Sequence, residues 1–371
     1  MCKRSDLPPA QRGNLQYDLE PMLSSNSAVQ GSAPVRRAFQ VKALPHTLAE
    51  IVKSPTITVL LLFLLTLLLA GVSFAQSASL KRQPEEVIID TDIGDDIDDA
   101  FAVALALRSP EIEILGVSTT FGDTELRAKL VDRMLGEAGR TDIHVAVGLH
   151  TDAKTSFGQR PYAQGGHFRR ASHPPSVEFI LDQIRRHPGE ITLVTIGPLV
   201  NVGAMIEQDG DMFRKLKRVV IMGGSIDRGY GDPYSPPTAP EPEWNIKNDI
   251  SSAKKLFASG VPIYQMPLDS TQLKLDEVKR AFLFRQGTPL VDALAILYHQ
   301  WGQETPTLYD PMTIAFIDDP TLCPVAPMHV DIDSEGMTRR GAGPANAQVC
   351  LHSDSEAFFR FYLSRLRAFA P

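Results

Sequence analysis

The chain has 371 residues, of which 43% are hydrophobic and 22% are charged, and its formal net charge is −7 at pH 7. This length allows one large domain or two ordinary ones, and the hydrophobic content is sufficient for a buried core. The negative charge argues against a nucleic-acid-binding protein, since no basic excess is available to neutralise phosphates.

The N-terminal part of the chain differs from the rest. Residues 1–52 are rich in Pro, Ser, Ala and Gln without sustained periodicity, which predicts a disordered extension. An apolar run over residues 57–75 follows, and the small residues at its end fit signal-peptidase cleavage after Ala75. We therefore expect residues 53–75 to be a signal peptide and the protein to be exported, to a periplasmic or extracellular compartment. The alternatives are an uncleaved inner-membrane anchor and a misassigned start codon, with translation beginning near Val52.

After this segment, short apolar runs alternate with segments of helical periodicity. Strands that read as Val and Ile runs separated by helices predict an α/β fold, with a mostly parallel central sheet covered by helices on both faces, in one domain over residues 86–371. In such folds, ligands bind beyond the carboxyl ends of the strands. The predicted strands are Val87–Asp90, Ile112–Ser118, Ile143–Val147, Ile191–Ile196, Arg218–Met222, Val261–Gln265 and Met328–Ile332. The predicted helices are Asp98–Arg108, Glu125–Glu137, Ser176–Arg186, Val200–Gln208, Ser251–Ser259, Leu290–Trp301 and Ser355–Arg367.

An acidic loop links the first predicted strand to the first predicted helix. Its six carboxylates belong to Asp90, Asp92, Asp95, Asp96, Asp98 and Asp99. Crowded charges repel one another and are costly to desolvate, and a hard divalent metal with oxygen ligands is the simplest remedy. Residues i and i+2 of an extended segment point the same way, so we expect Asp90 and Asp92 to face one site. Asp98 and Asp99 open the helix, where capping is an alternative role.

Two other families that begin with acidic loops fit the spacing poorly. An EF-hand is excluded because Gly94 comes one position early and Phe101 stands where the bidentate Glu belongs. A phosphatase of the haloacid dehalogenase type also begins with Asp-x-Asp after a strand. It normally continues with Thr or Val where this chain has Gly94.

The segment from residue 90 to residue 100 resembles the start of the inosine-uridine preferring nucleoside hydrolase family. That family typically has Asp-x-Asp-Pro-Gly-x-Asp-Asp-Ala after a strand, and this chain has Asp-Thr-Asp-Ile-Gly and then Asp-Asp-Ala. Ile93 replaces the Pro, and the loop is two residues longer. The Asp-Asp pair of the family therefore corresponds either to Asp95/Asp96 or to Asp98/Asp99. We favour the second pair because Ala100 and the predicted helix follow it directly.

Further blocks follow in the family's order. Counterparts occur for its Thr-Gly-Pro-Leu-Thr-Asn turn, its strand ending in Met-Gly-Gly, and its Glu-Phe-Asn, Leu-Asp-Val-Thr and His-Asp-Pro segments. The resemblance thus extends from about residue 86 to the C-terminus. The counterparts are Thr195–Asn201, Val220–Gly224, Glu243–Asn245, Leu268–Thr271 and Leu308–Pro311.

The resemblance implies an N-ribosyl hydrolase that cleaves a nucleoside into ribose and a free base. It also implies a bound calcium ion (Ca²⁺) and direct attack by water, with Asp92 as the general base. The implied calcium ligands are Asp92, Asp99, the backbone carbonyl of Ile196, and Asp310. The implied substrate contacts are Asp98, Met222, Glu243, Asn245 and Asp310.

Three positions on the leaving-group side depart from the family. Tyr309 stands where the purine and pyrimidine branch has the His that is thought to protonate the leaving base, and a phenol is the poorer acid near neutral pH. Tyr309 can still donate a hydrogen bond or stack on a base. Asp123 replaces an Asn that follows a Gly, and His167 is a candidate for the base pocket or a surface-loop residue. These changes suggest a ribosyl hydrolase whose aglycone is not an ordinary nucleobase.

The expected partners follow from the same resemblance. They are a small-molecule nucleoside and further copies of the chain, in a dimer or tetramer, with membrane contact only if the apolar segment stays uncleaved. The alternative function is a periplasmic ribonucleoside- or sugar-binding protein of the same fold with weak or no hydrolysis. Asp92 argues against it, since a binding protein has little need of a base. Cys323 and Cys350 can pair in an oxidising compartment, although their spacing alone does not show proximity.

Overall fold

The computed structural model describes residues 83–168, 170–231 and 234–367. The predictions for residues 1–52 and 53–75 lie outside the described residues. Within the described ranges, no helix is both long enough and apolar enough to cross a membrane.

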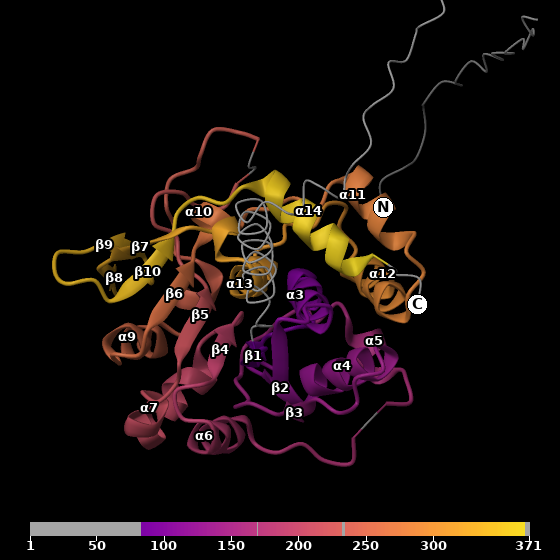
Figure 1. The fold of residues 1–371 in the computed structure, drawn as a ribbon, viewed down its shortest axis with the longest axis horizontal. Coiled ribbons are helices and arrows are strands. Elements are labelled where there is room, and N and C mark those ends of the chain that lie inside the picture. Colours follow the sequence, from indigo (N-terminus) through magenta and orange to yellow (C-terminus); the bar gives the residue numbers. More distant parts are fainter. Residues whose placement is uncertain (1–82, 169, 232–233, 368–371) are drawn as a thin grey trace, which may run out of the picture. The chain divides into compact units, whose positions relative to one another are not determined.

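The main sheet has eight strands and a mostly parallel arrangement (Figure 1). Its strands are β1 (Glu85–Thr91), β2 (Ile112–Thr119), β3 (His144–Ala146), β4 (Thr192–Thr195), β5 (Arg218–Met222), β6 (Ile263–Met266), β7 (Val325–Met328) and β10 (Ala347–Cys350). Their order is β3-β2-β1-β4-β5-β6-β10-β7, and β7 alone runs antiparallel to its neighbour β10. The predicted α/β fold with a mostly parallel central sheet is therefore confirmed.

The position of β1 determines where a ligand can bind. Its two neighbours are β2 and β4, so the chain leaves β1 toward one edge of the sheet and later returns to build the other. Such a switch point leaves a crevice beyond the carboxyl ends of the two central strands. The acidic loop follows β1 directly and lies at this crevice.

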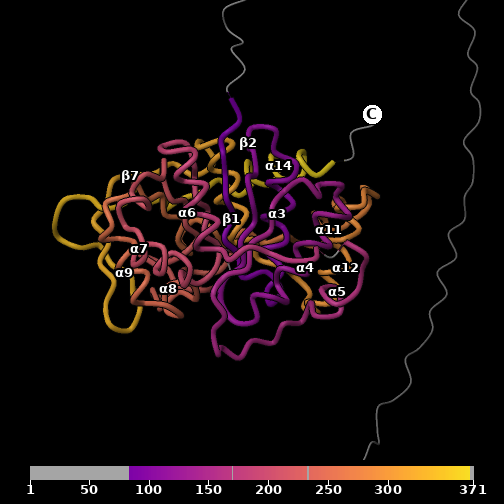
Figure 2. The backbone as a smooth tube through the Cα atoms, turned by 90° about the horizontal axis from the view of Figure 1, so that it is seen from below, coloured from indigo at the N-terminus to yellow at the C-terminus, as the bar shows by residue number. Residues whose placement is uncertain are grey.

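Helices cover both faces of the sheet. The helices are α3 (Asp98–Leu107), α4 (Thr124–Glu137), α5 (Arg160–Gln164), α6 (Ser176–Arg186), α7 (Val200–Phe213), α8 (Trp244–Lys247), α9 (Ile250–Ala258), α10 (Leu268–Thr271), α11 (Glu277–Phe284), α12 (Pro289–Trp301), α13 (Pro311–Asp318) and α14 (Ser355–Leu366). Side chains of α6, α7 and α9 pack in one apolar core, and those of α3, α4, α12, α13 and α14 pack in another. Figure 2 shows α6, α7 and α9 on one side of the molecule and α3, α4 and α12 on the other.

The alternation of side chains along β1 explains the two cores. Val87 and Ile89 are buried in the core that contains α3, whereas Ile88 is buried in the core that contains α6. A strand that is buried on both faces needs apolar residues at every position, as the sequence pattern indicated.

The prediction of one strand over residues 328–332 is wrong. The chain divides there into β7 and β8 (Val330–Ile332), and β8 pairs with β9 (Thr338–Arg340) in a separate two-stranded sheet. The backbone N–H of Val330 donates to Oδ1 of Asn346 at 2.8 Å, so a side chain takes the place of the next strand partner. A long-range contact of this kind leaves no signal in local periodicity.

A disulfide joins Cys323 and Cys350, whose Cα atoms are 5.6 Å apart. Cys323 follows the short 3₁₀ helix η1 (Pro320–Leu322), and Cys350 ends β10. The pairing that the sequence left open is therefore present, and it ties the segment after α13 to the main sheet.

Candidate active site

A cavity of about 280 Å³ lies beyond the carboxyl ends of β1, β4 and β5. The strand ends and loops that form it are brought together from distant parts of the chain. Carboxylates and aromatic rings dominate its lining. The lining residues are Asp92, Asp95, Asp96, Asp98, Asp99, Ile196, Met222, Tyr230, Glu243, Trp244, Asn245, Trp301, Gln303, Tyr309 and Asp310.

Three buried carboxylates form a group at the base of this cavity. Asp98 and Asp99 open α3, and Asp310 immediately precedes α13. Oxygen atoms of the three side chains lie within 4.8 Å of one another. The Asp310 backbone N–H donates to Oδ2 of Asp98 at 3.3 Å, and the Thr91 hydroxyl donates to Asp99.

Burial, and after it repulsion by neighbouring carboxylates that include Asp92, raise the pKa of all three carboxyl groups well above the usual range. No lining residue in the described part of the chain is a Lys, Arg or His that could compensate these charges. An all-oxygen donor set of this kind fits a hard divalent cation. The group is therefore a candidate metal site.

Asp92 lies beside this group. Its side chain is buried, and burial raises its pKa to about 7, an effect that Asp95 strengthens and Arg127 weakens. Gly197 permits this position, because a Cβ atom there would lie 2.8 Å from Oδ1 of Asp92. The turn after β4 thus approaches the acidic loop closely and brings Ile196 into the lining.

Arg127, on α4, holds the acidic loop in place. This side chain is fully buried, and its guanidinium donates to the carbonyls of Asp92, Ile93 (2.9 Å) and Phe121 (2.7 Å). It also forms an ion pair with Asp95 at 2.7 Å. Arg127 was not predicted, because nothing in helical periodicity distinguishes a buried arginine from one on the surface.

The two-residue insertion separates the roles of Asp95 and Asp96. Asp95 is engaged by Arg127 and accepts from the backbone N–H of Phe157. Asp96 is exposed at the cavity and accepts from the backbone N–H of Ile97 at 2.7 Å. The structure groups the other pair, Asp98 and Asp99, with Asp310, which is the arrangement favoured from the sequence.

Glu243 and Asn245 lie on the other side of the cavity, close to the end of β5. The Glu243 carboxylate caps α8 and accepts from the backbone N–H groups of Gly224 (3.0 Å), Asn245 (2.9 Å) and Ile246 (3.1 Å). Asn245 donates from Nδ2 to the carbonyl of Met222 at 3.1 Å. These contacts fix two polar side chains that can bind hydroxyl groups of a ligand.

Aromatic residues line the remaining wall. Tyr309 meets Tyr230 edge to face, with ring centroids 5.9 Å apart. The Tyr230 hydroxyl lies 3.4 Å from Oε1 of Glu243 and accepts from the Trp244 backbone N–H at 2.9 Å. Burial and the nearby Asp98 raise the pKa of Tyr309, so it is an even weaker acid than a free phenol. Tyr230, Trp301 and Gln303 were not predicted as site residues, and Trp244 was noted only as part of a motif.

Two predicted substrate contacts lie outside the lining. Asp123 caps α4, and its Oδ1 accepts from the Leu126 N–H at 3.0 Å. His167 is exposed in the loop after α5. Neither residue lines the cavity: Asp123 caps α4 instead, and His167 takes the surface-loop position that was the alternative expectation for it.

Asp90 was also expected to face the site, and it does not line the cavity. Its Oδ1 accepts from the hydroxyl of Ser118 and from Nδ2 of Asn201 at 2.8 Å. Because β1 ends at Thr91, the alternation of side chains does not continue to Asp92. Asp90 thus connects the end of β1 with β2 and α7 through these hydrogen bonds.

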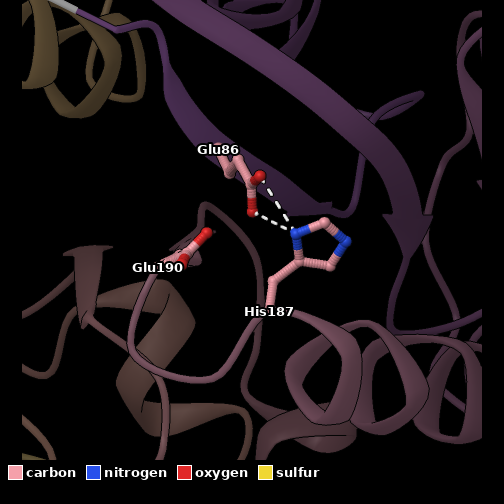
Figure 3. Close-up of side chains that lie close together, drawn as sticks. All are labelled: Glu86, His187 and Glu190. Atoms are coloured by element: carbon pink, nitrogen blue, oxygen red, sulfur yellow. Dashed lines mark hydrogen bonds and ion pairs between the residues drawn. The ribbon is translucent and has the colours of Figure 1, made fainter.

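A second cluster is formed by Glu86, near the start of β1, together with His187 and Glu190. Figure 3 shows these three side chains close together. Nδ1 of His187 is 3.0 Å from the Glu86 carboxylate, and an oxygen of Glu190 is within 4.8 Å of the ligand atoms of both. His187 directly follows α6. The hydrogen-bond contact between His187 and Glu86 accounts for these two side chains, and none of the three residues lines the cavity.

Comparison with known proteins gives consistent matches. The family model described as inosine-uridine preferring nucleoside hydrolase matches residues 87–360. The pyrimidine-specific ribonucleoside hydrolase RihA of Citrobacter koseri is 30% identical over 321 residues, which cover 76% of this chain and 98% of that protein. Among solved structures, the plant nucleoside hydrolase PpNRh1 is similar with a TM-score of 0.68 and 25% identity, covering 77% of this chain and 100% of that chain. A purine-preferring ribonucleoside hydrolase from Gardnerella vaginalis has a TM-score of 0.66 and 23% identity, covering 76% and 98%.

Proposed function

This chain belongs to the inosine-uridine preferring nucleoside hydrolase family, and from that premise we propose that it hydrolyses the N-glycosidic bond of ribonucleosides in a calcium-dependent reaction with Asp92 as the general base. It is an N-ribosyl hydrolase, whose products are ribose and a free base. The observation that carries the proposal is the meeting of Asp92, the Asp98/Asp99/Asp310 group and Glu243 in one cavity.

The donor set fits calcium. Asp92, Asp99, Asp310 and the backbone carbonyl of Ile196 would hold the ion, which accepts six to eight oxygen ligands and so leaves room for water and ribose hydroxyls. When bound, the ion supplies positive charge that stabilises the buried carboxylates and polarises a neighbouring water molecule.

Side chains of the protein have separate roles in proton transfer and in ribose binding. Asp92 accepts a proton from the attacking water, and the water oxygen forms a bond to the anomeric carbon as the bond to the base nitrogen breaks. Attack on the face opposite the base inverts the anomeric configuration, as in inverting glycosidases. Asp98, Glu243 and Asn245 grip the ribose hydroxyls and hold the anomeric carbon in line with the water.

The disulfide supports export of the protein. Disulfides persist in oxidising compartments, and Cys323–Cys350 is one within the catalytic domain. We propose cleavage after Ala75 and a periplasmic or extracellular location, with a homodimer or homotetramer as the working form. N-terminal sequencing of the mature protein tests the cleavage: a first residue well before Gln76 contradicts it. Light scattering of the purified protein measures the oligomer.

A nucleoside panel tests the proposed function. Purified protein is incubated with uridine, cytidine, inosine and adenosine, and released ribose is measured with a reducing-sugar assay. We expect ribose from at least one nucleoside, loss of activity after treatment with a calcium chelator, and recovery when calcium is restored. A protein that binds these nucleosides and releases no ribose contradicts hydrolysis, and activity that survives the chelator contradicts the metal requirement.

A further inference from the structure

We propose that the aglycone side of this cavity selects a positively charged base, so that N-ribosyl pyridinium nucleosides are a preferred substrate class, with Asp96 as the residue that determines this specificity. The inference rests on the proposed N-ribosyl hydrolysis and identifies the substrate class of the same site. Three observations carry it: an uncompensated carboxylate, a wall of aromatic rings, and the leaving-group chemistry of the lining.

Asp96 is a carboxylate without a cationic partner at the cavity. It comes from the insertion that lengthens the acidic loop, and it is exposed where a ligand would enter. Its neighbour Asp95 is neutralised by Arg127, whereas Asp96 has hydrogen bonds only from the Ile97 backbone and the Trp301 side chain among the described residues. A divalent ion held by Asp92, Asp99 and Asp310 still leaves more carboxylates than positive charges among the lining residues. A cationic ligand would compensate this excess.

The aromatic wall is suited to the same kind of ligand. The chain has two tryptophans, and both line this cavity, together with Tyr230 and Tyr309. Trp244 is 43% exposed, which is unusual for so large a ring and leaves surface for a ligand to cover. Lys247 already holds its Nζ 5.3 Å from the centroid of this ring, and Lys247 is not part of the lining. Tryptophan faces attract cations and also stack on flat heterocycles.

The lining favours a leaving group that needs no proton. Its described side chains are carboxylates, phenols, indoles, amides, a thioether and one aliphatic group, and none is an imidazolium or ammonium acid. A neutral base must be protonated as it leaves, whereas a pyridinium ring accepts the electron pair of the broken C1′–N bond and becomes a neutral pyridine. Water supplies the oxygen that bonds to C1′, and its proton passes through Asp92 to solvent. The products are ribose, pyridine base and one proton.

The proposal is tested by comparing the substrate preference of a variant with that of the wild type. Because each substrate is its own reference in this comparison, differences in intrinsic reactivity between the two substrates cancel. The probes are nicotinamide riboside, a pyridinium nucleoside, and uridine, assayed by ribose release with calcium present. For the Asp96→Asn variant we expect the ratio of kcat/KM for the pyridinium riboside to kcat/KM for uridine to fall about 10- to 100-fold, because loss of an ionic contact has an effect of this size. The matched control is Asp292→Asn, an exposed carboxylate on the same helix as Trp301, and it should leave the ratio unchanged.

A second variant covers the case in which Asp96→Asn does not fold. Gln303→Glu adds a carboxylate to the lining and should raise the same ratio. The inference is overturned if the wild-type protein hydrolyses uridine and leaves the pyridinium riboside intact, or if either variant leaves the ratio as it is in wild type. In those cases the proposed hydrolase function stands. If no nucleoside in the wider panel releases ribose, the proposed function itself has failed.

Discussion

Among the single side chains of the site, Asp92 is the one on which turnover depends most directly. Its carboxylate is buried next to three others and has a pKa raised to about 7 without a metal. Asn has nearly the same shape and cannot accept the proton from water. We expect Asp92→Asn to lower kcat by about 100- to 10,000-fold, the usual contribution of a general base.

Ribose release under saturating nucleoside measures this effect. Circular dichroism and urea unfolding of the same variant check that the fold is retained. Turnover near the wild-type rate in a folded Asp92→Asn protein would assign the base to another residue.

Arg127 is a second single residue on which the site depends, because it holds the backbone of the acidic loop. Its planar guanidinium contacts three carbonyl groups and Asp95, and a lysine ammonium cannot reach all four. We expect Arg127→Lys to lower the free energy of unfolding by about 2–4 kcal/mol, because buried acceptors lose their donor.

Urea unfolding gives this difference. Exposed Arg185 on α6 provides the control, and its change to Lys should leave the unfolding midpoint where it is. A midpoint for Arg127→Lys equal to that of wild type would mean that the loop does not need the guanidinium.

At the scale of elements, the disulfide links two segments that local pattern does not connect. Cys323 and Cys350 are separated by 27 residues, and closing a loop of this length restricts the unfolded chain. We expect the double variant Cys323→Ser/Cys350→Ser to lose about 3 kcal/mol of unfolding free energy.

Thermal and urea unfolding with and without reductant measure this loss. Reduction of the wild type should reproduce the effect of the double variant, and reductant should not affect the variant itself. Equal stability of all four samples would show that the bond contributes nothing measurable.

Sequence pattern also explains which elements were found. Strands β1 and β5 were predicted because buried parallel strands contain continuous apolar runs. Helix α13 was not predicted, and seven of its eight residues are buried. A helix that is apolar on all sides has no amphipathic period to detect.

For the whole molecule, the buried carboxylates link metal binding to stability. Without metal, the folded-state pKa of Asp92 is about 7, against a reference value of 3.8, and those of Asp98, Asp99 and Asp310 are raised too. A raised folded-state pKa means that folding favours the protonated form. The contribution to stability is complete below about pH 4 and is lost as the pH rises through about 7.

We therefore expect chelated protein to lose unfolding free energy between pH 5 and pH 7.5, and calcium-loaded protein to lose less. Urea titrations at several pH values, with chelator or with calcium, measure both curves. Parallel curves would show that the carboxylates do not form the metal site.

The sequence by itself determined the fold class, the carboxylates around the candidate metal and the residues expected to bind ribose. These features are encoded locally: strand and helix periodicity over short windows, and motifs in which neighbouring residues act together. Asp92, Asp98, Asp99, Glu243, Asn245 and Asp310 were predicted as site residues from the resemblance of their motifs to those of the family, and all of them line the cavity.

Only the tertiary structure decided the other half of the site. Asp96 lines the cavity whereas Asp95 pairs with Arg127, and the lining also includes Trp301, the last residue of α12, and Gln303 just after it. Asp123 and His167 lie outside the cavity because a helix cap and a loop path direct them elsewhere. The physical reason is that leaving-group specificity depends on contacts between residues far apart in the chain, and such contacts leave no pattern in the sequence around any one of them.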